Sequence, residues 1–301
     1  MNLKVNLAGV ELNNPVMTAS GTFGSGMEFA ELLDLNRLGA VVTKGVASVP
    51  WPGNPTPRIA ETAGGMLNAI GLQNPGIETF VERDLRFLED YPETRVIVNV
   101  CGKTTEEYLD VVERLADEKR VDLLEINISC PNVKEGGIAF GQDPRAVEAI
   151  TRAVKERARQ PVIMKLSPNV TDITVMARAA EAGGADAISL INTLTGMKFD
   201  INRRTFALAN RTGGLSGPAI HPIAVRMVWQ AAHAVSIPVI GMGGIASAED
   251  AIEFLMAGAT AVSVGTANFH NPTVTLEVIE GIRAYMERFG FDEVGQIRLE
   301  E

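Results

Sequence analysis

Short apolar runs recur along this chain, each bounded by Gly, Pro or Asn and separated from the next by a helix-length amphipathic stretch. This alternation is typical of βα units, which place parallel strands side by side with helices outside them. Eight such runs in 301 residues favour an α/β fold: one (β/α)8 TIM barrel domain spanning residues 1–301. The runs are Val16–Ala19, Ala40–Lys44, Val96–Cys101, Leu123–Ser129, Val162–Leu166, Ala187–Asn192, Pro238–Met242 and Ala261–Gly265.

The segments between these runs predict the remaining architecture. The alternating stretch Leu3–Leu12 turns at Ala8-Gly9, which predicts an N-terminal β-hairpin against the barrel floor. Helices are expected at Ala146–Arg159, Ile173–Ala182 and Ala248–Ala257, the last with Ser247 as cap and Gly258 as stop. Two connections, Gly45–Arg95 and Thr193–Ser236, are too long for turns, so we expect long loops that form a wall and lid over the C-terminal rim.

Charge and composition exclude several classes of protein. The chain carries 27 basic and 37 acidic residues, net −10, which argues against nucleic-acid or anionic-membrane partners. No apolar run approaches the ~18 residues of a membrane span and no export signal is recognisable, so a cytoplasmic protein is expected. Cys101 and Cys130 are the two cysteines, too few for an iron–sulfur cluster.

Metal and dinucleotide motifs are also missing from the sequence. His221, His233 and His270 have no metal-ligand spacing, so no metal site is expected. We expect His233 on a helix surface, His270 in a loop and His221 in the lid. No Gly-x-Gly-x-x-Gly follows a strand, so NAD should not bind this chain through a Rossmann unit.

The fourth apolar run leads into Ser129-Cys130-Pro131-Asn132. Pro131 cannot donate to a sheet ladder, so pairing should end there and leave Cys130 at the carboxyl tip of the strand. In a parallel barrel this tip belongs to the catalytic rim. The alternative is a buried cysteine that acts as a small hydrophobe.

Polar residues follow several of the other apolar runs. Lys44 ends the second run and Lys165 is the next-to-last residue of the fifth, and two cations are therefore expected at one mouth, although a lysine can also be a solvated surface residue. Asparagine amides offer a donor and an acceptor on a short stem, which suits the edge of a pyrimidinedione or isoalloxazine ring. These asparagines are Asn99, Asn127 and Asn192 at strand ends and Asn68 in the first long connection.

Glycines close the last two strands, at Gly243-Gly244 and at Gly265-Thr266. These two loops often bind phosphate in barrels of this kind, because glycines let backbone N–H groups approach the oxygens. Plain tight turns are the alternative. The sequence therefore predicts a site at the C-terminal rim of the barrel that binds a ligand with a polar ring and a phosphate.

In these residues and motifs, the chain resembles class 1 dihydroorotate dehydrogenases, and the resemblance extends over nearly its whole length. The resemblance rests on Asn68–Asn74, Asn127–Val133, Lys165–Pro168 and Asn192-Thr193. It implies FMN contacts at Ser20, Lys44, Gly45, Asn99, Asn127, Lys165, Ile191, Gly217, Gly243, Gly244, Gly265 and Thr266. It also implies an orotate site of Lys44, Asn68, Ala69, Ile70, Gly71, Leu72, Asn127, Asn192 and Thr193.

The same resemblance implies the reaction, the oxidation of (S)-dihydroorotate to orotate in pyrimidine (UMP) biosynthesis. Cys130 would be the general base that removes the C5 proton, while hydride leaves C6 for N5 of FMN. Lys44 would bind the substrate carboxylate. Ala69-Ile70 and Lys134–Gly137 resemble the NAD-using branch, class 1B.

In that branch a second subunit should carry FAD and a [2Fe-2S] cluster, and this chain should form a homodimer within a heterotetramer. Other interpretations stay open at this point. They are a fumarate-using class 1A enzyme, a flavin enzyme acting on dihydrouracil, a Schiff-base aldolase that uses Lys165, and a non-catalytic FMN-binding subunit.

Overall fold

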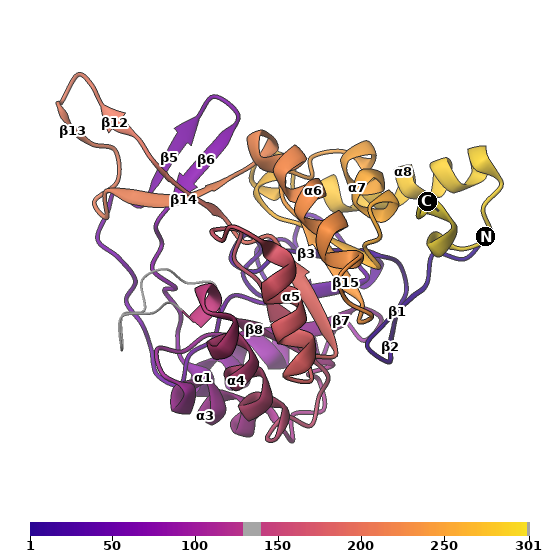
Figure 1. Cartoon of the computed structure of the whole chain (residues 1–301), viewed down its shortest axis with the longest axis horizontal. Coiled ribbons are helices and arrows are strands. Elements are labelled where there is room, and N and C mark those ends of the chain that lie inside the picture. The colour runs from indigo at the N-terminus through magenta and orange to yellow at the C-terminus, as the bar shows by residue number, and fades with distance from the viewer. Residues whose placement is uncertain (129–139, 300–301) are drawn as a thin grey trace.

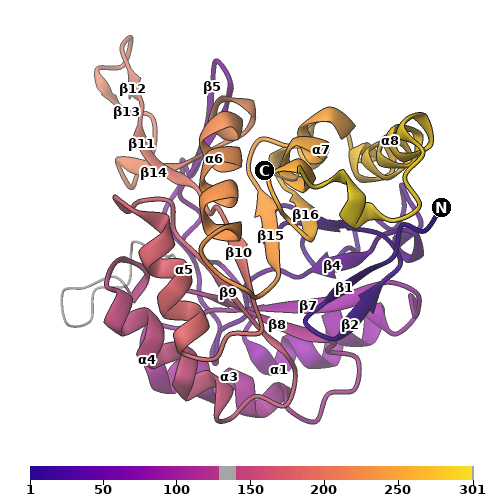
Figure 2. The ribbon, with the colours of Figure 1, turned by 45° about the vertical axis from the view of Figure 1, so that its right-hand side comes forward.

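The computed structural model describes residues 1–128 and 140–299, and within these ranges eight parallel strands close into a barrel (Figures 1 and 2). The strands are mostly apolar because helices cover their outer faces and the barrel interior their inner faces. The strands, in spatial order, are β3 (Val16–Thr18), β4 (Ala40–Val42), β7 (Arg95–Val100), β8 (Leu123–Asn127), β9 (Val162–Lys165), β10 (Ala187–Leu190), β15 (Val239–Met242) and β16 (Ala261–Val264). The expected (β/α)8 barrel is confirmed.

Helices surround the barrel, as both ribbon views show. The α-helices are α1 (Ile77–Thr79), α2 (Arg86–Leu88), α3 (Thr105–Leu115), α4 (Pro144–Lys155), α5 (Ile173–Ala182), α6 (His221–Ala232), α7 (Ala248–Met256) and α8 (Val274–Phe289). A π-helical segment, η2 (Phe80–Leu85), joins α1 to α2. The 3₁₀ helices are η1 (Leu35–Arg37), η3 (Phe140–Gln142), η4 (Pro218–Ile220), η5 (Thr266–Phe269) and η6 (Val294–Ile297).

The three expected helices are present with small shifts. The helix expected at Ile173–Ala182 has those bounds in α5, whereas α4 begins two residues earlier and ends four residues earlier than expected. Pro144 explains the earlier start, because proline is favoured at the first helical position and Asp143 caps it. The N–H of Arg145 donates to the Asp143 carboxylate and lowers the pKa of that carboxyl.

Ser247 caps α7 through a capping box, as expected. Its hydroxyl accepts the N–H of Asp250 at 3.3 Å, and the Asp250 carboxylate accepts the N–H of Ser247 at 2.9 Å. We therefore expect Ser247→Ala to lower the free energy of unfolding by about 1 kcal/mol, since the N–H of Asp250 loses its hydroxyl acceptor. Chemical denaturation measures this loss. Ser236→Ala, at an exposed serine outside the helices, is the control, and an equal effect there would contradict the capping role.

The N-terminal hairpin pairs β1 (Val5–Leu7) with β2 (Val10–Leu12) and turns at Ala8 and Gly9, both with positive φ. It lies at the amino ends of the barrel strands, because Nε of Arg95, the first residue of β7, donates to the carbonyl of Glu11 at 2.9 Å. Leu7 and Leu12 are fully buried. The hairpin therefore covers the barrel floor, as expected.

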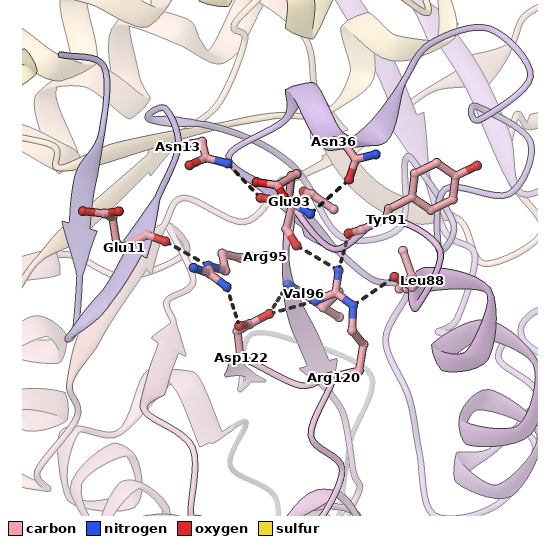
Figure 3. A network of polar contacts seen from close by, with 11 residues as sticks. Glu11, Asn13, Asn36, Leu88, Tyr91, Glu93, Arg95, Val96, Arg120 and Asp122 are labelled. Atoms are coloured by element: carbon pink, nitrogen blue, oxygen red, sulfur yellow. Dashed lines mark hydrogen bonds and ion pairs between the residues drawn. The ribbon is translucent and has the colours of Figure 1, made fainter.

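A network of polar contacts joins the loops of this floor (Figure 3). The guanidinium of Arg120 donates to the carbonyl oxygens of Leu88, Tyr91 and Thr94 at 2.8 to 2.9 Å. It also pairs with Asp122 at 3.1 Å. Arg120 thus connects the segment before β7 to the segment before β8.

The two long connections meet in an antiparallel sheet that stands beyond the barrel (Figure 1). It contains β5 (Ile59–Thr62), β6 (Gly65–Asn68), β11 (Leu194–Met197) and β14 (Thr212–Ser216), in the order β11-β14-β6-β5. A small hairpin of β12 (Phe199–Asp200) and β13 (Thr205–Phe206) extends from it. We call the four-stranded sheet the rim sheet.

No helix in the described ranges has the length and apolar character that crossing a membrane requires.

Candidate active site

A buried carboxylate organises polar side chains inside the barrel. Glu125, in the middle of β8, is 2% exposed. One of its oxygens, Oε1, accepts hydrogen bonds from Asn99 Nδ2 at 2.7 Å and from Lys165 Nζ at 3.3 Å, and the other, Oε2, accepts one from the Ser189 hydroxyl at 2.8 Å. These partners come from β7, β9 and β10, so the contacts span four adjacent strands. We call these four residues the Glu125 cluster.

Asn99 faces two ways. Its amide nitrogen donates to Glu125, whereas its Oδ1 is buried and has no hydrogen-bond partner in the described part of the chain. A Cβ on Gly45 would lie 2.9 Å from this oxygen, so the backbone of Gly45 passes beside it. A buried acceptor without a partner is costly. The site therefore fits a ligand that brings an N–H or O–H group to Asn99.

The two lysines both lie at the carboxyl ends of strands. Lys165 is the last residue of β9 and 5% exposed. Lys44 follows β4 by two residues and is half-buried, with its ammonium near the position that a Cβ of Gly21 would take, at 3.4 Å. Asn127 ends β8, is paired in register with Lys165, and its carbonyl accepts the hydroxyl of Tyr108 at 2.7 Å. The two lysines therefore belong to one rim, as expected, and Lys165 is buried.

Glycines crowd together at the ends of β15 and of the rim sheet. Gly244 has φ of +75°, and a Cβ there would lie 2.7 Å from His221 Cβ and 2.9 Å from the carbonyl oxygen of Gly217. A Cβ on Gly243 would meet Ala224 at 2.6 Å. Only glycine fits this approach of α6 and the segment after β14 to the β15–α7 turn. We call Gly217, Gly243 and Gly244 the glycine cradle.

The end of β16 lies beside the same sheet. The Thr266 hydroxyl donates to that of Ser216, the last residue of β14, at 2.8 Å. A Cβ on Gly265 would lie 3.4 Å from Ala19, the neighbour of Ser20. Ile191 is buried, and its N–H donates to the carbonyl of Met242 at 3.0 Å. The structure thus gathers most of the residues that the resemblance assigned to FMN.

The rim sheet brings together the residues assigned to the substrate. Asn68, the last residue of β6, donates to the carbonyl of Gly214 at 3.5 Å, and a Cβ on Gly214 would lie 1.9 Å from Thr193 Oγ1. Asn192 Oδ1 accepts the N–H of Thr193 at 2.7 Å. Two segments from different long connections therefore meet around Gly214.

The residues that follow Asn68 in the first long connection lead back to the barrel. The carbonyls of Ala69 and Ile70 accept from the side chain and the backbone of Asn54 at 2.9 and 3.0 Å. Gly71 has φ of +74° and packs against Asn54 as well. Leu72 reaches the barrel wall, because a Cβ on Gly45 would lie 3.7 Å from its side chain. The segment from Asn68 to Leu72 thus joins the rim sheet to the end of β4.

Sequence reasoning missed Glu125. The signal was a charged residue between apolar neighbours in the strand Leu123–Asn127, where a carboxylate needs buried partners. Cys130, with Ser129 and Lys134–Gly137, lies outside the described residues, so its predicted place at the strand tip stays a prediction.

His221 was expected in the lid but is the first residue of α6. Its Nδ1 lies 3.1 Å from the carbonyl oxygen of Gly243, and its Nε2 lies 3.2 Å from Glu253. Pro222, which follows it, favours a helix start at this position. His233 and His270 are exposed, at the ends of α6 and η5. No group of three His, Cys, Asp or Glu in the described ranges could hold a metal ion.

Comparison with known proteins agrees with this geometry. Residues 2–286 match the family model described as dihydroorotate dehydrogenase. The chain is 69% identical over 297 residues to a protein of Lachnoclostridium phytofermentans named dihydroorotate dehydrogenase B (NAD(+)), catalytic subunit, covering 99% of this chain and 98% of that protein. Proteins with the same name from Alkaliphilus metalliredigens and Geotalea uraniireducens are 63% and 57% identical, and each match covers at least 97% of both chains. The chain therefore belongs to the dihydroorotate dehydrogenase family.

Proposed function

We propose that this chain is the catalytic subunit of an NAD-dependent dihydroorotate dehydrogenase, which oxidises (S)-dihydroorotate to orotate in pyrimidine biosynthesis. The 69% identity to a relative named dihydroorotate dehydrogenase B (NAD(+)), catalytic subunit, is the observation that carries this proposal. The buried Asn99 oxygen that lacks a partner in the described residues, beside Gly45 and the Glu125 cluster, supports a bound ligand with a donor group. The names of the relatives support the NAD-linked form over the fumarate-using one.

The residues at the rim fit FMN. Bound FMN would supply the two-electron acceptor that the oxidation requires. The Asn99 oxygen can accept from a ring N–H, and the Lys165 ammonium can stabilise negative charge on the ring. The phosphate would bind at the glycine cradle with Gly265 and Thr266, where backbone N–H groups can approach its oxygens. Ser20, Lys44, Gly45, Asn127 and Ile191 complete the proposed cofactor site.

The substrate would lie between that site and the rim sheet. The Lys44 ammonium would bind its carboxylate, and the amides of Asn68, Asn127 and Asn192 would bind the alternating N–H and C=O edge of its ring. Thr193 and the segment Ala69–Leu72 would form the wall that separates the ring from water. A cation at Lys44 would favour dihydroorotate over dihydrouracil, which has no carboxylate.

Cys130 would remove the C5 proton. This role comes from the resemblance, since the residue lies outside the described ranges. A thiol is suited to the task, because its ordinary pKa of about 8.5 makes the thiolate accessible near neutral pH when ammonium groups are close.

The electrons would leave through another subunit. This chain has two cysteines, whereas a [2Fe-2S] cluster needs four protein ligands. We therefore propose a partner subunit that carries FAD and [2Fe-2S], in a heterotetramer built on a homodimer of this chain. A location in the cytoplasm fits this assignment.

An anaerobic acceptor experiment tests the proposal. Dihydroorotate should bleach the flavin band of the purified chain, and adding NAD, fumarate or a quinone then identifies the acceptor that restores it. We expect NAD to restore the colour rapidly only when the partner subunit is present. Full-rate NAD reduction by the chain alone would contradict the partner, and rapid reoxidation by fumarate would contradict the NAD branch. A chain that binds no flavin would refute the activity.

The glycine cradle gives a second test. Gly244→Ala should raise the dissociation constant of FMN at least about tenfold, because the new methyl group would collide with His221 and with the Gly217 carbonyl where the phosphate is expected. Gly290→Ala, at the end of α8, is a matched control, since Gly290 has a similar φ of +70° and a Cβ there would meet no atom within 4 Å. Fluorescence titration of the apoprotein measures both. Equal affinities in the two variants would place the phosphate elsewhere.

A further inference from the structure

We propose that Glu125 is a positioning residue that determines which atom of Asn99 faces the cofactor and balances the charge of Lys165. This inference rests on the proposed flavin site and deepens it. Glu125 itself lies below the rim, bonded to side chains of the barrel interior, and nothing in the reaction requires it to touch the substrate.

The first step concerns the orientation of the Asn99 amide. An ionised carboxylate only accepts hydrogen bonds, so the amide group that faces Glu125 at 2.7 Å must be the NH₂ group. The carbonyl oxygen, Oδ1, is then turned the other way, where it has no partner in the described residues. Glu125 therefore makes Asn99 present an acceptor, and the matching ligand group is a ring N–H.

The second step concerns charge. Glu125 and Lys165 form an ion pair at 3.3 Å with side chains 2% and 6% exposed, so solvent screens the pair weakly. Glu125 is the one hydrogen-bond partner of Lys165 Nζ within the described ranges. The carboxylate offsets the positive potential that Lys165 exerts on a bound ring. Without it, Lys165 would favour the reduced, negatively charged ring more strongly.

The third step concerns how firmly the carboxylate is held. Oε1 of Glu125 accepts from Asn99 and Lys165. The Ser189 hydroxyl adds a bond to the second carboxylate oxygen, so both oxygens are held. The carboxylate is thus fixed in place and has a defined orientation toward both partners.

The test measures FMN affinity and the midpoint potential of the bound flavin. Glu125→Gln should raise the dissociation constant of oxidised FMN about tenfold, because a glutamine NH₂ group lets Asn99 turn its oxygen inward. The reduced ring should bind as before, held by the uncompensated Lys165. A tenfold change in the ratio of the two affinities raises the midpoint potential by about 30 mV.

Two further variants separate charge from packing. Glu125→Asp keeps the charge and should shift the potential by less than a third of that amount. Ser189→Ala removes a donor from the carboxylate without altering its charge, leaves more negative potential at the ring, and should lower the midpoint potential, by about 14 mV for a threefold change in ratio. Ser263→Ala, which removes a buried hydroxyl bonded to the carbonyl of Thr18, is the control and should leave the potential unchanged.

The outcomes distinguish this inference from the proposed function. Equal shifts in Glu125→Gln and Glu125→Asp, or an unchanged potential in Glu125→Gln, would overturn the positioning role while the flavin site stands. If Glu125→Gln does not fold, an unchanged or raised midpoint potential of the flavin in Ser189→Ala would overturn the positioning role instead. Wild-type protein without affinity for FMN would overturn both.

Discussion

Cys130→Ala should slow the reduction of bound flavin by dihydroorotate about 10²-fold or more while leaving FMN bound. The variant loses the group proposed to remove the C5 proton, and a positioned general base contributes a factor of this size. Stopped-flow absorbance under anaerobic conditions measures the rate directly. The wild-type rate should rise with pH as the thiol ionises, and the variant should lose this dependence.

Two variants make the result specific. Cys130→Ser retains a group that can be a base but ionises far less readily than a thiol, so its rate should lie between those of the wild type and the alanine variant at neutral pH. Cys101→Ala removes the other cysteine, which is buried against Ala47 and Trp51, and should change the reduction rate far less than Cys130→Ala does. A wild-type rate in Cys130→Ala would remove this thiol from the mechanism.

The barrel could be predicted from the sequence because each of its strands is a local feature. A strand such as Val162–Lys165 is buried on both faces and therefore reads as one apolar run, with helices and glycine stops between successive runs. The rim sheet could not be predicted in this way. Its strands are mostly half-exposed, and Gly214 on β14 pairs with Asn68, which lies 146 residues earlier in the chain. Such pairing leaves no periodic pattern in either segment.

The candidate site was also only partly predictable from the sequence. Lys44 and Lys165 could be placed at the rim because each lies at the end of an apolar run, and Asn99 could be placed near it because it lies close to the end of another. Their partners could not be assigned, because the contact between Asn99 and Glu125 depends on the register of β7 against β8. The glycine pairs indicated a phosphate site, but the approach of α6 to Gly244 requires the three-dimensional packing of His221. Chemistry-bearing residues were therefore more predictable than the side chains that orient them.

Arg120→Met should lower the free energy of unfolding by about 3 kcal/mol, the largest stability effect that we expect. Burial lowers the pKa of Arg120, but an arginine stays charged at any physiological pH. Its guanidinium is the donor for three carbonyl oxygens and a partner of Asp122 (Figure 3), and methionine supplies no donor. Leaving buried carbonyls and a carboxylate with fewer partners costs free energy of this order.

A change in the floor network should affect stability but not activity, because active sites of such barrels lie at the opposite, carboxyl ends of the strands. The folded fraction of Arg120→Met should therefore retain wild-type flavin binding and reduction. Arg145→Met is the control: its side chain is 91% exposed and pairs with Asp143 at 3.5 Å, so we expect a change below about 0.5 kcal/mol. Urea denaturation followed by tryptophan fluorescence compares the two variants. Equal unfolding midpoints would mean that the carbonyls around Arg120 find other donors and that this network does not hold the floor together.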